Sequence, residues 1–164
     1  DRVSESIFNL LIHSNKFTFK FLESNILDLY SGTGSFGLEC LSRDSKNVYF
    51  VENEKETIRI LKKNIKNLQL IDKGHIFSKD VLNLLNVKNT FNLKFDLIFC
   101  DPPFKFLNVE KLLYLIFINN LLHEDGIIIL HRNKKSIDKF PKQFKIIEKK
   151  IYGISKVYFG KILF

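Results

Sequence analysis

The chain has 164 residues, of which 45% are hydrophobic and 27% are charged, so its composition excludes a disordered polypeptide and predicts one domain, residues 1–164, with its own core. No apolar run approaches the roughly 18 residues that a membrane helix needs, so we expect no membrane partner. The net charge of +8 is concentrated toward the C-terminus, where residues 132–161 carry ten basic and two acidic residues, and this favours a nucleic-acid partner.

Helical and extended patterns alternate in the first half of the chain. Residues 2–13 carry apolar side chains at helical spacing and predict an amphipathic helix. The apolar stretch 25–30 predicts a strand that ends at a glycine-rich turn, and residues 36–42 continue from this turn as a helix. A second strand is expected at 48–51, followed by the most regular helical pattern in the chain, at 55–68.

The same alternation continues in the second half of the chain. Residues 75–78 predict a strand, and residues 81–85 predict a short helix. A further strand is expected at 95–100, followed by a helix at 109–119. Residues 126–130 read Gly-Ile-Ile-Ile-Leu, and so apolar a run is typical of a central strand that is buried on both faces.

The chain closes with two alternating stretches, 144–151 and 156–163, which have no helix between them and predict an antiparallel hairpin. Strands that alternate with helices form βαβ units and a parallel sheet. We therefore expect an α/β fold: a doubly wound, mostly parallel seven-stranded sheet with helices on both faces, Rossmann-like in its winding, and with the hairpin at its edge. Ligands bind such sheets at the C-terminal ends of the strands.

The turn after the first strand matches the pattern G-x-G-x-x-G with Gly32, Gly34 and Gly37. Because a strand precedes it and a helix follows, it is a candidate nucleotide site: Gly32 and Gly34 would let the backbone approach a ligand, and Gly37 would let the helix pack on the sheet. Glu52 ends the next strand and could accept both ribose hydroxyls, which NAD and S-adenosylmethionine share. Asp28 favours S-adenosylmethionine, because a carboxylate would repel the pyrophosphate of NAD; its alternative role is a turn cap.

Asp101-Pro102-Pro103-Phe104 directly follows the strand at 95–100, at the edge where ligands bind. The two prolines stiffen the loop and remove two N–H donors, which leaves carbonyl groups and the Asp101 carboxylate as acceptors. Such acceptors suit the two N–H bonds of an exocyclic amine on a nucleobase, and the Phe104 ring suits stacking on the base. A simple turn after the strand is the alternative interpretation.

Together these motifs resemble those of class I S-adenosylmethionine-dependent amino-methyltransferases. The opening segment Asp1–Asn9, DRVSESIFN, is similar to the D-R-V-R-E-x-x-F-N segment of the RsmD family of 16S ribosomal RNA guanine-N2 methyltransferases. Ser4 departs from this pattern, because the family usually has Arg there. The resemblance covers the whole chain, and its other matching segments are Leu27–Gly34, Gly37–Glu39, Leu41–Arg43 and Phe99–Phe104.

The resemblance implies a class I methyltransferase fold and an enzymatic activity. The enzyme would transfer a methyl group from S-adenosylmethionine to the exocyclic N2 of a guanine in small-subunit (16S) ribosomal RNA and release S-adenosylhomocysteine. Asp101 and the Pro102 carbonyl would hold the amine, Pro103 would belong to the same rigid loop, and Phe104 would stack on the base. The cofactor-binding residues that the resemblance implies are Asp28, Tyr30, Gly32, Gly34, Gly37, Glu52, Asn53 and Asp80.

Some of these assignments have an alternative. Asp80 would either hold the adenine amino group or cap the helix that follows it. Arg2, Lys105 and Arg132, with other basic residues of 132–161, are expected to contact RNA phosphates, whereas a solvated surface position is the simpler interpretation of any single Lys. The two cysteines and four histidines show no ligand spacing, so we expect them to be structural or surface residues and expect no metal site.

Three other functions fit parts of the sequence. Methylation of adenine N6 or cytosine N4 in DNA or RNA shares the Pro-Pro loop, but it needs a target-recognition insertion for which 164 residues leave no room. An NAD-dependent oxidoreductase would leave residues 101–104 unexplained, and an inactive RNA-binding or assembly module would leave the intact motifs unexplained. We expect a monomer that acts on ribosomal RNA or on a small-subunit assembly intermediate, in the bacterial cytoplasm or alternatively in an organelle. Because the chain begins with Asp1 rather than Met, we also expect further residues before it.

Overall fold

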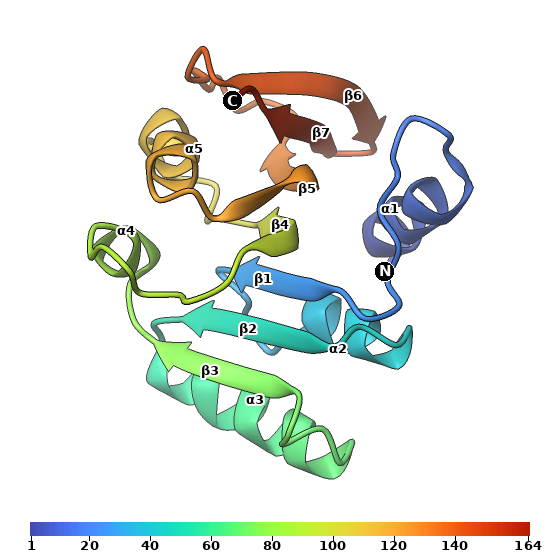
Figure 1. Cartoon of the computed structure of the whole chain (residues 1–164), viewed down its shortest axis with the longest axis vertical. Coiled ribbons are helices and arrows are strands. Elements are labelled where there is room, and N and C mark those ends of the chain that lie inside the picture. Colours follow the sequence, from blue (N-terminus) through green and yellow to red (C-terminus); the bar gives the residue numbers. More distant parts are fainter.

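The computed structural model describes residues 1–164 and contains one sheet of seven strands with five helices (Figure 1). The strand order is β3-β2-β1-β4-β5-β7-β6. The strands from β1 to β5 run parallel, whereas β7 is antiparallel to both β5 and β6. The elements are α1 (Arg2–His13), β1 (Asn25–Leu29), α2 (Ser35–Ser42), β2 (Asn47–Glu52), α3 (Lys55–Asn67), β3 (Gly74–Ser78), α4 (Val81–Leu85), β4 (Phe95–Cys100), α5 (Val109–Ile118), β5 (Leu122–Asn133), β6 (Phe144–Tyr152) and β7 (Ser155–Ile162).

The sheet separates two apolar cores, which confirms the expected doubly wound architecture. Helices α1, α2 and α3 lie on one face of the sheet, and α4 and α5 lie on the other (Figure 1). Buried side chains of each group pack against the face that it covers. The regular pattern at 55–68 is explained by α3, whose Ile58, Leu61 and Ile65 are buried against the sheet. None of the helices has both the length and the apolarity to cross a membrane.

The winding of the sheet reverses between β1 and β4. The chain moves from β1 outward through β2 and β3, and then returns to place β4 on the other side of β1. The last residues of the two strands are direct neighbours, because Leu29 pairs with Cys100. In open α/β sheets this reversal creates the crevice in which ligands bind. Both sequence motifs start here, the glycine-rich turn after β1 and the Asp101–Phe104 loop after β4.

β5 differs most from its prediction, because it extends from Leu122 to Asn133 rather than over 126–130 alone. At its start, Leu122 pairs with Phe95 of β4. At its end, the three polar residues 131–133 pair with β7. Apolar patterning marks only the part of a strand that is buried on both faces, whereas ladder hydrogen bonds with β7 also hold the polar end. This extension brings His131 and Arg132 close to the Asp101–Phe104 loop.

Candidate active site

The loops after β1, β2 and β4 are joined at one edge of the sheet. The Asp101 N–H donates to the Leu29 carbonyl over 3.3 Å, which ties the start of the Asp101–Phe104 loop to the end of β1. The Ser31 N–H donates to the Val51 carbonyl over 3.0 Å, which ties the glycine-rich turn to β2. The ends of β1, β2 and β4 and the loops that follow β1 and β4 are therefore hydrogen-bonded to one another, although they are far apart in the sequence.

The glycine-rich turn contains two left-handed residues near its start, Tyr30 at φ 60° and Gly32 at φ 59°. A positive φ is uncommon for a residue with a side chain, and such residues cluster at functional sites. The Gly32 N–H donates over 2.8 Å to Oε1 of Glu52, so the end of β2 holds the turn. A Cβ added at Gly32 would meet no atom within 4 Å. Gly32 therefore faces open space, where a ligand can approach the backbone.

Gly34 and Gly37 are required by core packing. A Cβ added at Gly34 would lie 2.4 Å from Cδ1 of Leu61, and one added at Gly37 would lie 2.4 Å from Cε1 of Phe50. The prediction that Gly37 lets the helix pack on the sheet is confirmed. The missing side chain of Gly34, which was expected to admit a ligand, instead makes room for α3. Cofactor contacts through the backbones of these two glycines stay a prediction.

Asp28 is a buried carboxylate on β1, next to the glycine-rich turn, with 1% of its surface exposed. Its Oδ2 accepts a hydrogen bond of 3.1 Å from the Gly37 N–H, whereas Oδ1 has no partner. Burial raises the pKa of Asp28 well above its usual range; the Gly37 N–H opposes this shift, and the charges of Asp101 and Glu52 add to it. A buried carboxylate with a free oxygen suits a cationic group of a ligand.

Replacing Asp28 with Asn is expected to weaken cofactor binding and to remove its dependence on pH. An ammonium group of the cofactor favours the ionised carboxylate, so affinity should be full above the raised pKa of Asp28 and should fall as the pH decreases through it. Isothermal titration with S-adenosylhomocysteine over a series of decreasing pH values measures this dependence. The same pH dependence in the wild type and the variant would contradict the assigned role.

The stability of the cofactor-free protein provides the control for this substitution. Because folding raises the pKa of Asp28, its contribution to stability is present at low pH and disappears as the pH rises through the folded-state pKa. Asn carries no charge that must be buried. Thermal melts should therefore show the Asp28→Asn protein gaining stability relative to the wild type as the pH rises from the ordinary pKa of an aspartate to the raised pKa of Asp28, which separates an effect on binding from an effect on folding.

A cavity of about 440 Å³ lies beside the glycine-rich turn. Tyr30 and Glu52 line it from the ends of β1 and β2, Asp80 lines it from the end of β3, and Pro103 contributes from the loop after β4. The cavity thus connects residues that were expected to bind the cofactor with the loop that was expected to bind the base. Its remaining lining residues are Val51, Asn53, Glu54, Lys79 and Val81.

Three buried polar atoms at this edge have no hydrogen-bond partner in the protein: Asp28 Oδ1, Tyr30 OH and Ser31 Oγ. An unpaired buried polar atom is costly, so such atoms mark places where ligand bonds are missing. S-Adenosylmethionine carries an ammonium group, a carboxylate and ribose hydroxyls, and these match one carboxylate and two hydroxyls. The residues present therefore fit this cofactor. Ser31 and Lys79 were not expected from the sequence; their positions just after β1 and β3 were the available signal.

Glu52 and Asp80 also anchor the backbone locally. Glu52 accepts from the Gly32 N–H through Oε1 and from the two residues that follow it through Oε2, at 3.0 Å each. Asp80 caps α4, because its Oδ2 accepts from the Asn83 N–H over 3.1 Å, so the helix-cap alternative is confirmed. Each carboxylate oxygen has two lone pairs, so ribose and adenine contacts remain compatible with these anchoring bonds.

The Asp101–Phe104 loop presents acceptors and an exposed aromatic ring. The Asp101 side chain is 45% exposed, and Phe104 is 57% exposed. The Pro102 carbonyl accepts no hydrogen bond from the protein, whereas the Pro103 carbonyl accepts one of 2.9 Å from Arg132 and one of 3.0 Å from the Phe106 N–H. A free carbonyl, a carboxylate and a ring therefore occur within four successive residues, which is the set that an amine on a nucleobase needs.

Arg132 is buried, and the expectation that it contacts RNA phosphates is wrong. Its side chain is 2% exposed and pairs with Asp138, which is 4% exposed, at 3.0 Å between Nε and Oδ2. The guanidinium also donates to the carbonyls of Pro103 over 2.9 Å and Phe106 over 2.8 Å. An arginine that binds two loops together in this way has a structural role. Charge counting along the sequence could not distinguish it from the surface lysines.

The other basic residues divide into exposed and inward-facing groups. Arg2 is exposed on the first turn of α1, and Lys105 is exposed in the loop after β4, so phosphate contacts by both stay a prediction. Lys156 is buried and donates through Nζ to the Ser136 carbonyl. The loop after β5 has four exposed lysines: Lys134, Lys135, Lys139 and Lys142.

Both cysteines are buried residues of the core. Cys40 and Cys100 are buried and unpaired, and burial raises the pKa of both thiols well above their usual range. Buried thiols of this kind are unreactive. No group of three or more His, Cys, Asp or Glu side chains is arranged to hold a metal ion.

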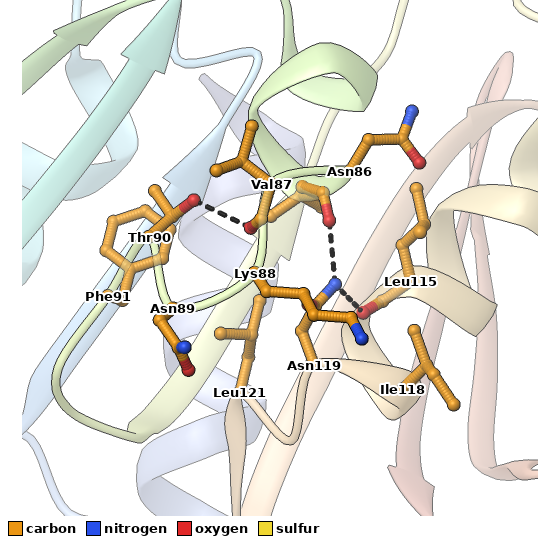
Figure 2. A pocket seen from close by; sticks show the side chains of 11 residues that line it. Asn86, Val87, Lys88, Asn89, Thr90, Phe91, Leu115, Ile118, Asn119 and Leu121 are labelled. Atoms are coloured by element: carbon orange, nitrogen blue, oxygen red, sulfur yellow. Dashed lines mark hydrogen bonds between the residues drawn. The ribbon is translucent and has the colours of Figure 1, made fainter.

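Another cavity, of about 360 Å³, lies between the loop after α4 and the end of α5 (Figure 2). Thr90 Oγ1 donates to the Val87 carbonyl over 2.8 Å, and Asn119 Nδ2 donates to the Leu85 carbonyl over 2.7 Å. These polar groups are therefore satisfied within the protein. No residue of the glycine-rich turn or of the Asp101–Phe104 loop lines this cavity, so it is separate from the candidate active site.

Comparison with known proteins places this architecture in a family. The family described as Conserved hypothetical protein 95, the RsmD family, matches residues 1–161. The chain belongs to this family. The Ribosomal RNA small subunit methyltransferase D of Haemophilus influenzae is 32% identical over 158 residues, which cover 94% of this chain and 77% of the relative.

Solved structures agree with this membership. A structure from Haemophilus influenzae has a TM-score of 0.81 at 31% identity and covers 100% of this chain and 98% of that chain. An RNA methyltransferase from Salinibacter ruber, in complex with S-adenosyl-L-homocysteine, has a TM-score of 0.68 at 14% identity and covers 99% of this chain and 91% of that chain, which shows a shared fold. This RsmD-family chain is a methyltransferase with the class I fold.

Proposed function

We propose that this chain transfers a methyl group from S-adenosylmethionine to the exocyclic N2 of a guanine in 16S ribosomal RNA. The observation that carries the proposal is the Asp101–Phe104 loop, which presents a free carbonyl, a carboxylate and an exposed ring and reaches the cofactor cavity through Pro103. The name of the Haemophilus influenzae relative refers to small-subunit ribosomal RNA, and this supports RNA rather than DNA as the substrate.

The contribution of the protein to this reaction is placement of the amine. When bound, S-adenosylmethionine supplies an electrophilic methyl carbon on a sulfonium. The Asp101 carboxylate and the Pro102 carbonyl accept the two N–H bonds of the guanine amine, which fixes the direction of the nitrogen lone pair. Orientation of this kind can lower a barrier by roughly 7–11 kcal/mol.

The same two acceptors stabilise the charge that develops during transfer. The amine nitrogen becomes positive as its bond to the methyl carbon forms, and the negative Asp101 lies beside it. Because the Asp101 side chain is 45% exposed, the displaced proton has a direct path to solvent after transfer. No strong general base is therefore needed.

Phe104 provides the surface for the target base. A base must leave its stack before its amine can enter the site, and this costs a few kcal/mol. An exposed aromatic ring replaces the original stacking, with about 1–3 kcal/mol per base. The 57% exposure of Phe104 leaves its ring accessible for this contact.

Exposed lysines beside the site would bind the RNA backbone. Changing Lys105, Lys134 and Lys139 together to Gln is expected to weaken RNA binding and to flatten its salt dependence, by about 0.7 in the slope of log K against log salt for each phosphate that is no longer neutralised. Filter binding across a salt series measures this slope. The matched control changes Lys62, Lys63 and Lys66 on α3, and an equal effect of both triple variants would contradict a localised RNA surface.

The test of the proposed function uses radiolabelled S-adenosylmethionine. Naked 16S RNA and small subunits, both from a strain that lacks the family enzyme, are offered as substrates, and the labelled nucleoside is identified after digestion. N2-methylguanosine is the expected product. N6-methyladenosine or N4-methylcytidine would replace the guanine assignment with the corresponding base, and bound cofactor without any labelled product would favour a non-enzymatic RNA-binding module.

The same assay addresses the physiological substrate. We propose that the protein acts as a monomer, on ribosomal RNA or on a small-subunit assembly intermediate, in the bacterial cytoplasm. A preference for partly assembled subunits over naked RNA supports an assembly intermediate, and analytical ultracentrifugation of the active protein tests the monomer.

A further inference from the structure

Two side chains from the strand pair β5–β7 stand next to the Asp101 carboxylate. His131, on β5, places Nδ1 at 3.1 Å from Oδ1 of Asp101. Its other ring nitrogen, Nε2, lies 2.9 Å from the hydroxyl of Ser155, the first residue of β7. The His131 side chain is 24% exposed, and Ser155 is buried, so the ring is held on one side by the protein interior.

The chemistry of Asp101, His131 and Ser155 determines which group donates in each of the two hydrogen bonds. A carboxylate only accepts hydrogen bonds, so the ring nitrogen that faces Asp101 must carry the proton. In a neutral imidazole the other nitrogen is then an acceptor, and the Ser155 hydroxyl is the donor that it needs. Asp101 therefore selects the form of His131 that presents an N–H to it, and the Ser155 hydroxyl can donate to the other ring nitrogen in this form.

Asp101 has no other side-chain partner, so this interaction decides the orientation of the carboxylate. With Oδ1 facing His131, Oδ2 is left for the amine of the substrate. Arg132, the next residue of β5, holds the Pro103 carbonyl over 2.9 Å. The last residues of β5 therefore hold both the Asp101 side chain and the Pro103 carbonyl of the loop.

We propose that His131 is a positioning residue for methyl transfer: it orients Asp101, and Ser155 holds the orientation of its ring. This inference rests on the proposed function, because it takes Asp101 as the acceptor for the target amine. A misplacement of a reacting group by about 1 Å can cost roughly a hundredfold in rate, so removal of the His131 side chain should be visible in kcat.

Three substitutions of His131 separate positioning from packing. His131→Leu can form neither hydrogen bond, His131→Gln places its amide nearer the position of Nε2, and His131→Asn places its amide nearer the position of Nδ1. We expect kcat to fall about ten- to a hundredfold for Leu and Gln, with the KM for S-adenosylmethionine unchanged, and to be largely restored by Asn. Ser155→Ala should give a smaller decrease. His75→Leu is the matched control, because His75 is also a partly buried histidine whose Nε2 has one partner, Asn47, but it lies outside the site.

A second measurement does not depend on catalysis. Nitrogen-15 spectra of the imidazole rings, assigned with the His131 variants, report which ring nitrogen carries the proton. We expect Nδ1–H in the wild type and a change in the Asp101→Leu protein. An unchanged ring in Asp101→Leu, or equal kinetics for the Leu and Asn variants of His131, would overturn the proposal. If the wild type methylates no RNA at all, the proposed function fails, while the ring spectra still decide whether His131 responds to Asp101.

Discussion

Replacing Asp101 with Ala is expected to lower kcat for methyl transfer by about a hundred- to a thousandfold, while the affinity for S-adenosylhomocysteine stays close to that of the wild type. The substitution removes a charged acceptor from the position where positive charge develops on the amine. It leaves the cavity beside the glycine-rich turn unchanged, because Asp101 does not line that cavity. Single-turnover kinetics with saturating RNA measure the decrease in rate, and isothermal titration measures cofactor binding.

The Asp101→Asn protein is the matched variant for this prediction. Asn keeps one oxygen acceptor but carries no charge, so its kcat should lie between those of Ala and the wild type. Because Asp101 is exposed, both substitutions remove only a partly solvated interaction with His131. We therefore expect little change in the free energy of unfolding. Near-normal kcat in the Ala variant would show that the Pro102 carbonyl and stacking on Phe104 suffice to place the base.

Replacing Arg132 with Met is expected to destabilise the protein by about 3–5 kcal/mol. The change leaves the Asp138 carboxylate buried without its charged partner, and it removes the donor to the Phe106 carbonyl and one of the two donors to the Pro103 carbonyl. Urea denaturation, followed by circular dichroism, measures the free energy of unfolding. A change below about 1 kcal/mol would mean that water or another side chain replaces the guanidinium.

A double variant separates the two roles of Arg132. Arg132→Met combined with Asp138→Leu removes the buried charge together with its partner, so much of the stability should return. The Phe106 carbonyl still lacks its donor, and the Pro103 carbonyl keeps only the Phe106 N–H, so kcat should stay low. Full recovery of kcat in the double variant would show that Arg132 contributes to folding only.

The fold and the main motifs could be predicted from the amino-acid sequence. Apolar side chains repeat with the period of a helix or a strand wherever an element buries one face, so α1, α3 and β4 lie where the pattern placed them. Gly and Pro are also informative locally, because their backbone preferences do not depend on distant residues. For this reason the glycine-rich turn and the Asp101–Phe104 loop could be assigned to the ligand edge from their positions after predicted strands.

The roles of individual polar side chains depend instead on contacts between distant parts of the chain. Arg132 and Lys134 are both basic residues of one segment, yet Arg132 is buried against Asp138 and Lys134 is exposed. The sequence showed no role for His131, because its partners Asp101 and Ser155 are 30 and 24 residues away. Burial and hydrogen bonding depend on which strands become neighbours, and this is a property of the sheet order rather than of any local pattern. Periodicity along the chain therefore predicts the fold, whereas contacts across the sheet complete the site.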